Sequence, residues 1–120
     1  MNKILVFSVL VLIFLCGCSN NSPSIKSVTC DEMKSILKEK NSYLIDVRTV
    51  SEYDESHLDN AINIPVDMIE SDIKKHNINY DDSIIVYCRS GKRSSNAAQT
   101  LLNLGYKKIY DLGAMSNCNK

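Results

Sequence analysis

Two kinds of spacing between hydrophobic residues alternate along the chain. Short segments at residues 25–28, 43–47, 84–87 and 108–112 are rich in β-branched and aromatic side chains, which is typical of strands. Between them, apolar residues recur at intervals of three and four, the period of a helix with one buried face. This alternation of strands and helices predicts an α/β fold with a mostly parallel sheet covered on both faces.

Three segments carry the helical spacing. The first begins with Thr29 and Glu32, which stand in the positions of a capping box, and ends near residue 40. The second covers residues 66–75 and the third covers residues 97–104, where Gly105 is placed to end the helix as a C-cap. The side chains expected to face inward are Met33, Ile36 and Leu37 in the first helix, Met68, Ile69 and Ile73 in the second, and Ala97, Ala98, Leu101, Leu102 and Leu104 in the third.

The start of the chain differs from the rest, because residues 4–15 form an almost unbroken apolar run behind the single charge of Lys3. At about 1.5 Å per helical residue this run spans about 18 Å, which is less than the roughly 30 Å hydrocarbon core of a bilayer. Its length is typical of the apolar region of a secretory signal peptide. A lipoprotein signal, an ordinary secretory signal and an uncleaved short anchor are the three interpretations.

The apolar run ends in Leu15-Cys16-Gly17-Cys18, which resembles a bacterial lipobox. That resemblance implies cleavage behind Gly17 and two acyl chains on Cys18, enough for a stable anchor in a lipid membrane. The polar residues that follow predict a flexible tether. We therefore expect a signal peptide at residues 1–17, a lipidated tether at 18–24 and one domain at 25–118. The protein would be exported and would face outward from the cell membrane, on its periplasmic or extracellular side.

Length and charge narrow the choice of function. The chain has 120 residues, of which 44% are hydrophobic, so it can form one domain with a modest core. Fourteen basic and fourteen acidic side chains give a formal net charge of zero. A neutral chain has no general basic surface for nucleic acid, so we expect no nucleic-acid partner.

The strongest candidate for a reactive residue is Cys88, which follows the apolar segment 84–87. Ligands of parallel sheets bind beyond the carboxyl ends of the strands. A helix is expected just after Cys88, and its unpaired N–H groups would attract anions and lower the pKa of a nearby thiol. Two of the three arginines of the chain, Arg89 and Arg93, lie within five residues of Cys88, and Lys92 lies between them. This pattern predicts a thiolate in an anion-binding loop, whereas a purely structural cysteine would need no flanking cations.

The same loop resembles the C-x-x-G-x-R-[ST] active loop of rhodanese-like sulfurtransferases, over Cys88, Arg89, Ser90, Gly91, Lys92, Arg93 and Ser94. The resemblance implies a three-layer fold with a mostly parallel five-stranded sheet flanked by helices. It also implies that Cys88 carries a sulfane sulfur as a persulfide and that Arg89 to Ser94 bind the substrate. The partners would be a small anionic sulfur donor and a thiol or cyanide acceptor, and neither a metal nor an organic cofactor is needed.

Two further segments extend this resemblance over about residues 25–118. Residues 44–65 resemble the family pattern L-I-D-V-R-x-x-x-E-[FY]-x-x-G-H-I-x-G-A-I-N-I-P, with Ser56 and Asn60 in place of its two glycines. We expect Asp46 and Arg48 to form a structural ion pair and His57 to bond backbone groups without acting as a base. Near the end of the chain, Ala114 replaces a glycine of the family and Cys118 replaces a tryptophan.

The cysteines leave one structural question open. Cys30 follows the first predicted strand and Cys118 follows the last, so both could lie near the end of the sheet that carries Cys88. They could form a disulfide in an oxidising compartment, one of them could resolve a persulfide on Cys88, or both could be incidental.

Two other functions compete with sulfur transfer. Cysteine phosphatases and arsenate reductases use C-x5-R loops, whereas Cys88 and Arg93 are separated by only four residues. The shorter loop is expected to be too tight for a tetrahedral oxyanion and to suit a single sulfur atom. A persulfide carrier or thiol-redox sensor with little turnover would use the same residues as a sulfurtransferase.

Overall fold

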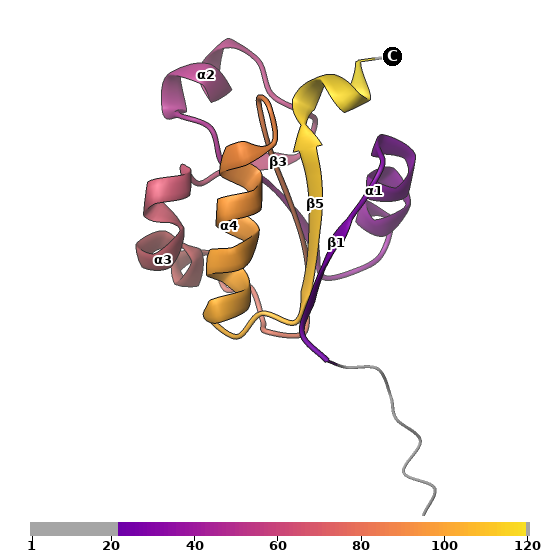
Figure 1. Cartoon of the computed structure of the whole chain (residues 1–120), viewed down its shortest axis with the longest axis vertical. Helices are drawn as coiled ribbons and strands as arrows, with labels where there is room; N and C mark the ends of the chain where they lie inside the picture. Colours follow the sequence, from indigo (N-terminus) through magenta and orange to yellow (C-terminus); the bar gives the residue numbers. More distant parts are fainter. Residues whose placement is uncertain (1–21, 120) are drawn as a thin grey trace, which may run out of the picture.

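Five parallel strands form the centre of the computed structural model, which describes residues 22–119 (Figure 1). The spatial order is β1-β5-β4-β2-β3, so β4 lies in the middle with a partner on each side. The predicted α/β fold with a five-stranded, mostly parallel sheet is confirmed. The strands are β1 (Ser24–Ser27), β2 (Ser42–Asp46), β3 (Ala61–Asn63), β4 (Ser83–Cys88) and β5 (Lys108–Ala114).

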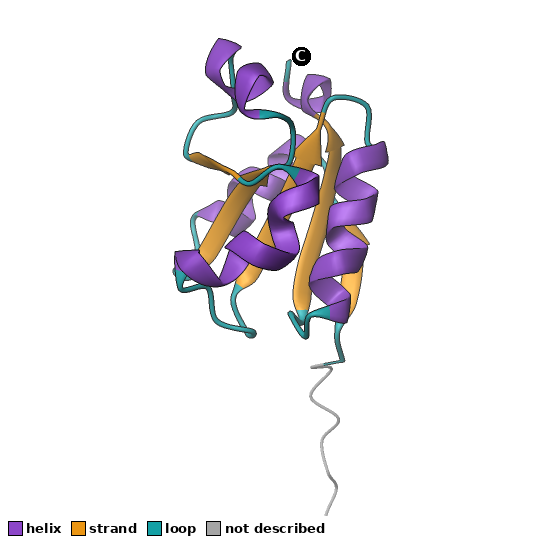
Figure 2. Ribbon diagram, turned by 90° about the vertical axis from the view of Figure 1, so that its left-hand side faces the viewer, coloured by secondary structure: helices purple, strands orange, loops and turns teal. Residues whose placement is uncertain are grey.

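Helices lie on both sides of this sheet (Figure 2). The longest is α4, directly after the loop that follows β4. The other α-helices are short, and 3₁₀ turns stand before and after α3 and after β5. The elements are α1 (Cys30–Leu37), α2 (Val50–Glu55), η1 (Val66–Met68), α3 (Ile69–Asp72), η2 (Ile73–His76), α4 (Lys92–Asn103) and η3 (Met115–Cys118).

The segment predicted as one helix over residues 66–75 is instead broken into η1, α3 and η2. Its tighter 3₁₀ turns change which side chains face the sheet. Ile69 and Ile73 are fully buried, as expected, but Met68 is 43% exposed, so its predicted inward position is wrong.

Two hydrophobic cores fill the spaces on either side of the sheet. In β4, Ile84, Val86 and Cys88 face the core that includes residues of α3, η2 and α4, while Ile85 and Tyr87 face the opposite core. Every residue of β4 is buried, which explains its nearly continuous apolar sequence. All five strands and both cores lie within residues 24–118, so we expect a fragment from Ser19 to the end of the chain to fold on its own.

A buried polar network joins the carboxyl ends of β2 and β4. Arg48 forms an ion pair with Asp46, with 2.6 Å between Nη2 and Oδ2, which confirms the predicted structural pair. Arg48 also donates to the carbonyl of Ser56. The Tyr87 hydroxyl donates to Asp46 at 2.8 Å and accepts a hydrogen bond from the N–H of Leu58 at 3.0 Å. The network therefore fixes the loop after α2 to the two central strands.

A disulfide joins Cys30 at the start of α1 to Cys118 at the end of η3, with 5.2 Å between the Cα atoms. Both cysteines pack against the core that contains Met33 and Tyr87, whereas Cys88 belongs to the core on the other face of the sheet. Among the described residues, Cys88 is the free cysteine. Of the three interpretations for Cys30 and Cys118, the structure has the disulfide, and its position across the sheet from Cys88 does not suit a resolving thiol.

The predicted signal peptide and the lipidated Cys18 lie outside the described residues. Within residues 22–119, none of the helices has both the length and the apolar character that a membrane span requires.

Candidate active site at the end of the central strand

Cys88 is the last residue of β4, so its position is set by the most firmly held strand of the sheet. β4 pairs with β2 and β5 along its length, and Cys88 stands opposite Ala114 of β5. A bulge in β5, after Val86 pairs with Asp111, shifts the register before this last pair. The thiol is fully buried and lies where the chain leaves the sheet to begin a helix.

The loop from Cys88 to α4 curls so that backbone N–H groups point at the sulfur. The N–H of Gly91 lies 3.0 Å from Sγ of Cys88, and the N–H of Ser94 lies 3.3 Å from it. Gly91 is the N-cap of α4 and has φ of +101°, a conformation that few side chains allow. The loop therefore forms a cradle in which one sulfur atom receives two backbone donors.

This cradle controls the acidity of Cys88. Burial raises the pKa of the thiol, but the backbone N–H groups of Ser94, Gly91 and Ser90 stabilise the thiolate and together lower the pKa below its ordinary value. The Ser94 hydroxyl donates to the carbonyl of Gly91 at 3.0 Å, and it also contributes to the lowered pKa of the thiol. At a given pH, a larger fraction of Cys88 than of a free cysteine is therefore expected to be thiolate, the nucleophilic form.

Arg93 forms an ion pair with a carboxylate of a neighbouring helix. Its Nη1 and Nη2 atoms donate to Glu52 of α2 at 2.7 and 3.0 Å, a two-point ion pair. Hydrogen bonding to Arg93 lowers the pKa of Glu52 to about 2, and the same contact raises the pKa of Arg93. The ion pair docks α2 on the start of α4, so Arg93 has a structural partner that the sequence did not reveal.

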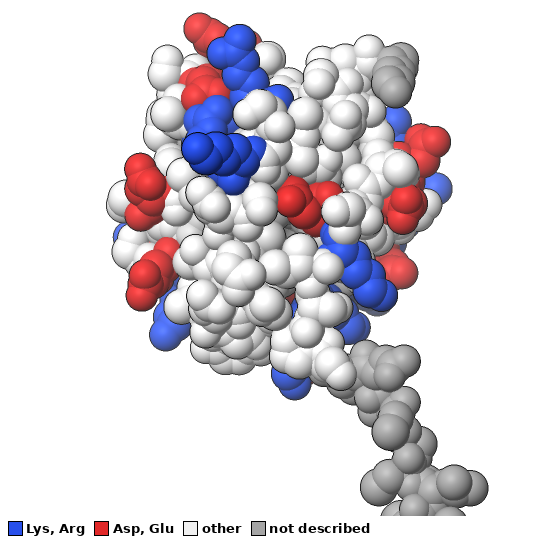
Figure 3. Space-filling view, in the orientation of Figure 1, with Lys and Arg blue, Asp and Glu red and all other residues white. Residues whose placement is uncertain are grey.

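Arg89, Ser90 and Lys92 are the exposed residues of the loop. In the part of the chain that the structure describes, neither Arg89 nor Lys92 forms an ion pair. Basic side chains gather over the start of α4 in Figure 3, with acidic side chains beside them. Two cations thus remain for an anion that approaches Cys88 from solvent.

The structure brings the predicted loop residues together and leaves His57 outside the group. His57 is exposed, stacks on Tyr53 with 3.8 Å between the ring centroids, and its Nδ1 lies 2.9 Å from the Tyr53 carbonyl. The expected hydrogen bond of His57 to a backbone group is therefore present. Over residues 22–119, His, Cys, Asp and Glu side chains do not gather into a group of three that could hold a metal ion.

Sequence reasoning missed two residues that shape the site, Glu52 and Tyr87. Glu52 occupies the E of the E-[FY] positions in the family pattern, and this match was the one signal in the sequence that could have marked it. Tyr87 lies next to Cys88 but points to the opposite face, where it bonds Asp46. An aromatic residue inside a buried strand is normally a core residue, so its hydroxyl gave no earlier sign of this role.

Comparison with known proteins agrees with the geometry. The chain is 30% identical over 95 residues to YrkF of Bacillus subtilis, which is provisionally named a sulfur carrier protein. The aligned region covers 78% of this chain but only 50% of YrkF. The chain is 32% identical over 73 residues to the thiosulfate sulfurtransferase PspE of Escherichia coli, covering 61% of this chain and 70% of PspE. The solved structure of a rhodanese with anions from E. coli superposes with a TM-score of 0.61 at 30% identity, over 63% of this chain and 89% of that one.

The family assignment rests on most of the domain. The family model of the rhodanese-like domain matches this chain from residue 29 to residue 117. The matched region includes the Cys88 loop, the Asp46–Arg48 pair and all of η3 except its last residue. The chain therefore belongs to the family of proteins with a rhodanese-like domain.

Proposed function

We propose that this protein is a sulfurtransferase that carries sulfur on Cys88 as a persulfide. The observation that supports the proposal most directly is the cradle, in which a buried thiol with a lowered pKa accepts hydrogen bonds from the N–H groups of Gly91 and Ser94. The Cys88 thiolate attacks the outer sulfur of thiosulfate, the S–S bond of the donor breaks, and sulfite leaves with the bonding electron pair. The outer sulfur of the new persulfide is then transferred to cyanide, which gives thiocyanate and restores the thiolate.

The loop residues have distinct roles in this proposal. The N–H groups of Arg89 to Ser94 surround the anionic outer sulfur and stabilise it without a change of structure. Arg89 and Lys92, which are exposed, attract an anionic donor such as thiosulfate. Arg93 holds α2 against the loop through Glu52. A similar solved structure, described as a rhodanese with anions, supports an anionic ligand for this protein.

The test uses a soluble fragment from Ser19 to the end of the chain. We expect it to form thiocyanate from thiosulfate and cyanide, and Cys88→Ser to form none, because serine cannot accept the sulfur. Ser95→Ala is the matched control, because Ser95 is a small, exposed residue of α4 that lies just outside the Cys88–Ser94 loop. Absence of Cys88-dependent thiocyanate together with Cys88-dependent hydrolysis of an aryl phosphate would replace the proposal with phosphatase chemistry.

A persulfide carrier with little turnover is the second candidate, and the similarity to YrkF favours it. Intact-mass measurement after thiosulfate or polysulfide treatment separates the two. A stable gain of one sulfur on Cys88 without thiocyanate release indicates a carrier. Rapid loss of that sulfur to cyanide indicates an enzyme.

We also propose that the mature protein starts at Cys18 and is held by two acyl chains on the outward face of the cell membrane. The apolar run at residues 4–15 and the lipobox-like Leu15-Cys16-Gly17-Cys18 support this. Metabolic labelling with palmitate is expected to label the full chain in a bacterial host and to leave Cys18→Ser unlabelled. Equal labelling of Cys16→Ser and the parent chain would confirm Cys18 as the acylated residue.

A further inference from the structure

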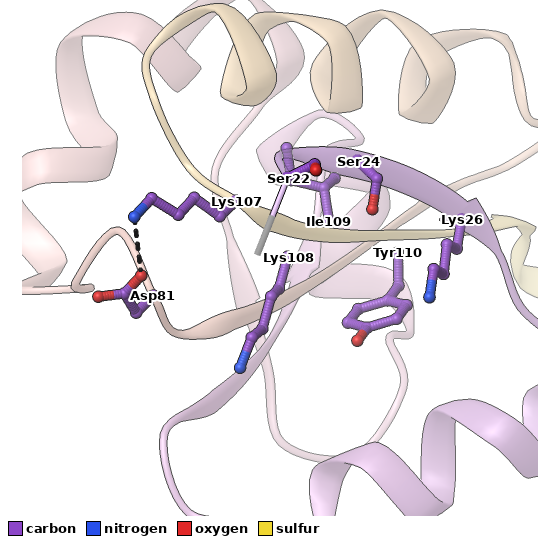
Figure 4. Close-up of a pocket in the computed structure, with 8 residues that line it drawn as sticks. All are labelled: Ser22, Ser24, Lys26, Asp81, Lys107, Lys108, Ile109 and Tyr110. Carbon is purple, nitrogen blue, oxygen red and sulfur yellow. Dashed lines mark ion pairs between the residues drawn. The ribbon is translucent and has the colours of Figure 1, made fainter. Parts of the chain in front are cut away.

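A small pocket lies at the end of the sheet opposite to Cys88. Figure 4 shows the residues that line it. It has a volume of about 120 Å³ and is formed where the parallel strands β1 and β5 begin. Ser22 and Ser24 of the entering chain line it together with Lys26, Lys108 and Tyr110. Because Cys88 ends β4, which runs parallel to β5, the pocket and the thiol lie at opposite ends of the same sheet.

The strand register places two lysines and a tyrosine on one face of the pocket. Ser24 pairs with Lys108 and Lys26 pairs with Tyr110, and residues two apart in a strand point to the same side. Figure 4 shows the side chains of Lys26, Lys108 and Tyr110 extending in the same direction from the two strands.

Acidic side chains also lie near this face: Asp81 lines the pocket, and Asp31 and Glu32 line an adjoining pocket together with Lys26 and Tyr110. Lys107, the next residue along the chain, points away and pairs with Asp81 at 3.3 Å, and Asp81 is the acidic residue that lines the pocket. Among residues 22–119, Lys26 and Lys108 form no ion pair. Two ammonium groups and a phenol hydroxyl are the donors that a phosphate group requires.

We propose that this pocket binds the phosphate groups of anionic membrane lipids and so seats the domain on the bilayer with Cys88 pointing away from it. The inference goes beyond sulfur transfer. It rests on the proposed anchor at Cys18 only because that anchor would keep the pocket close to the membrane. The stretch from Cys18 to Ser22 extends over at most about 17 Å, which keeps the start of β1 close to the lipid surface.

The chemistry of the pocket suits a lipid surface better than a free anion. The described residues carry fourteen acidic and twelve basic side chains, so the domain is nearly neutral overall and binding depends on the charges closest to the ligand. At a membrane, only charges within about 10 Å of the surface act strongly, and these include the two free lysines of the pocket. Tyr110, half-buried between the lysines, has the amphipathic ring that is enriched at membrane interfaces.

The test measures binding of the soluble fragment from Ser19 onward to phosphatidylcholine vesicles with and without phosphatidylglycerol, by co-sedimentation. We expect binding only to the vesicles that contain phosphatidylglycerol, and its loss at high salt. Lys26→Gln/Lys108→Gln is expected to weaken binding about 30-fold. The matched control, Lys34→Gln/Lys38→Gln, removes two exposed lysines from the α1 region and is expected to change binding by less than about twofold.

Three results would overturn the inference. These are equal binding to the two kinds of vesicle, an equal loss in both double variants, and displacement of the fragment by inorganic phosphate at matched ionic strength, which would indicate a site for a free anion. Circular dichroism checks that both variants are folded. Thiocyanate formation is measured in parallel and is expected to be unchanged by Lys26→Gln/Lys108→Gln, so a failure of lipid binding stays distinct from a failure of the proposed sulfur chemistry.

Discussion

The disulfide between Cys30 and Cys118 is expected to supply a large part of the stability of the domain. It closes a loop with a sequence separation of 88 residues, nearly the whole domain. In the chain-entropy view, a cross-link of this span raises the free energy of the unfolded chain by about 4.6 kcal/mol at 25 °C, because it lowers the chain entropy, and measured effects are typically about 2–5 kcal/mol. Domains of this size are stable by about 5–15 kcal/mol in total, so removal of the bond leaves a marginal fold.

The assay compares thermal unfolding of three samples of the Ser19 fragment: oxidised, reduced with dithiothreitol, and Cys30→Ser/Cys118→Ser. We expect Tm to fall by about 10–25 °C in the second and third samples relative to the first. Dithiothreitol should not shift Tm of the double variant. A thiol count under denaturing conditions should find one thiol, Cys88, before reduction and three after it.

The same samples also separate a stabilising bond from a catalytic one. Because the disulfide and Cys88 pack on opposite faces of the sheet, the double variant should form thiocyanate at the parent rate at temperatures well below its own Tm. The reasoning would be refuted if the double variant unfolded within about 0.5 kcal/mol of the oxidised parent, an effect typical of a surface substitution. A folded double variant that lost sulfur transfer would refute the separation of the two sites.

Three other predictions concern the site. Glu52→Gln removes the charge that holds Arg93 and should lower the free energy of unfolding by about 1 kcal/mol in urea titrations. Because the pKa of Glu52 falls from 4.5 to about 2 on folding, the ion pair stabilises the protein fully above pH 4.5, and this stabilisation is lost as the pH falls towards 2. The loss of stability in acid should therefore be weaker in the variant. The rate of sulfur uptake by Cys88 should be level at high pH and fall as the pH drops through the lowered pKa, so a midpoint at or above the ordinary value of about 8.5 would contradict the role of the cradle. Tyr87→Phe removes a hydrogen bond to the buried Asp46 and should cost about 2 kcal/mol in the same titrations, with little change in the pH profile of Cys88.

Local signals in the sequence predicted the parts of the fold that local physics decides. The capping box at the start of α1 is present, with the N–H of Glu32 bonded to Oγ1 of Thr29 at 3.2 Å and the Glu32 carboxylate bonded to the N–H of Thr29 at 3.4 Å. Apolar side chains at residues 84–87 predicted the buried strand β4, and the helix expected after Cys88 is α4. Each of these features depends on residues within a few positions of one another.

Features that depend on distant parts of the chain could not be predicted in this way. The helix α2 has no buried residue and therefore no apolar stripe, and it is held by the pairing of Glu52 with Arg93, 41 residues later. The strand β5 was predicted to end at Leu112 but continues to Ala114, because the bulge opposite Val86 lets it keep pairing with β4. The break of the predicted 66–75 helix likewise follows from packing against the sheet, which residue spacing does not contain.

The opposite placement of the entering chain and Cys88 makes the sheet a spacer of fixed height. The strand β4 rises by about 17 Å from Ser83 to Cys88, so on an anchored chain the cysteine would stand up to about this far above the lipid when the start of the sheet rests on the bilayer. Sulfur would then be handed over in the aqueous layer, beyond the lipid headgroups. A membrane-embedded acceptor could be served only through a domain that reaches the same height, whereas diffusing thiols and soluble proteins would meet the loop directly.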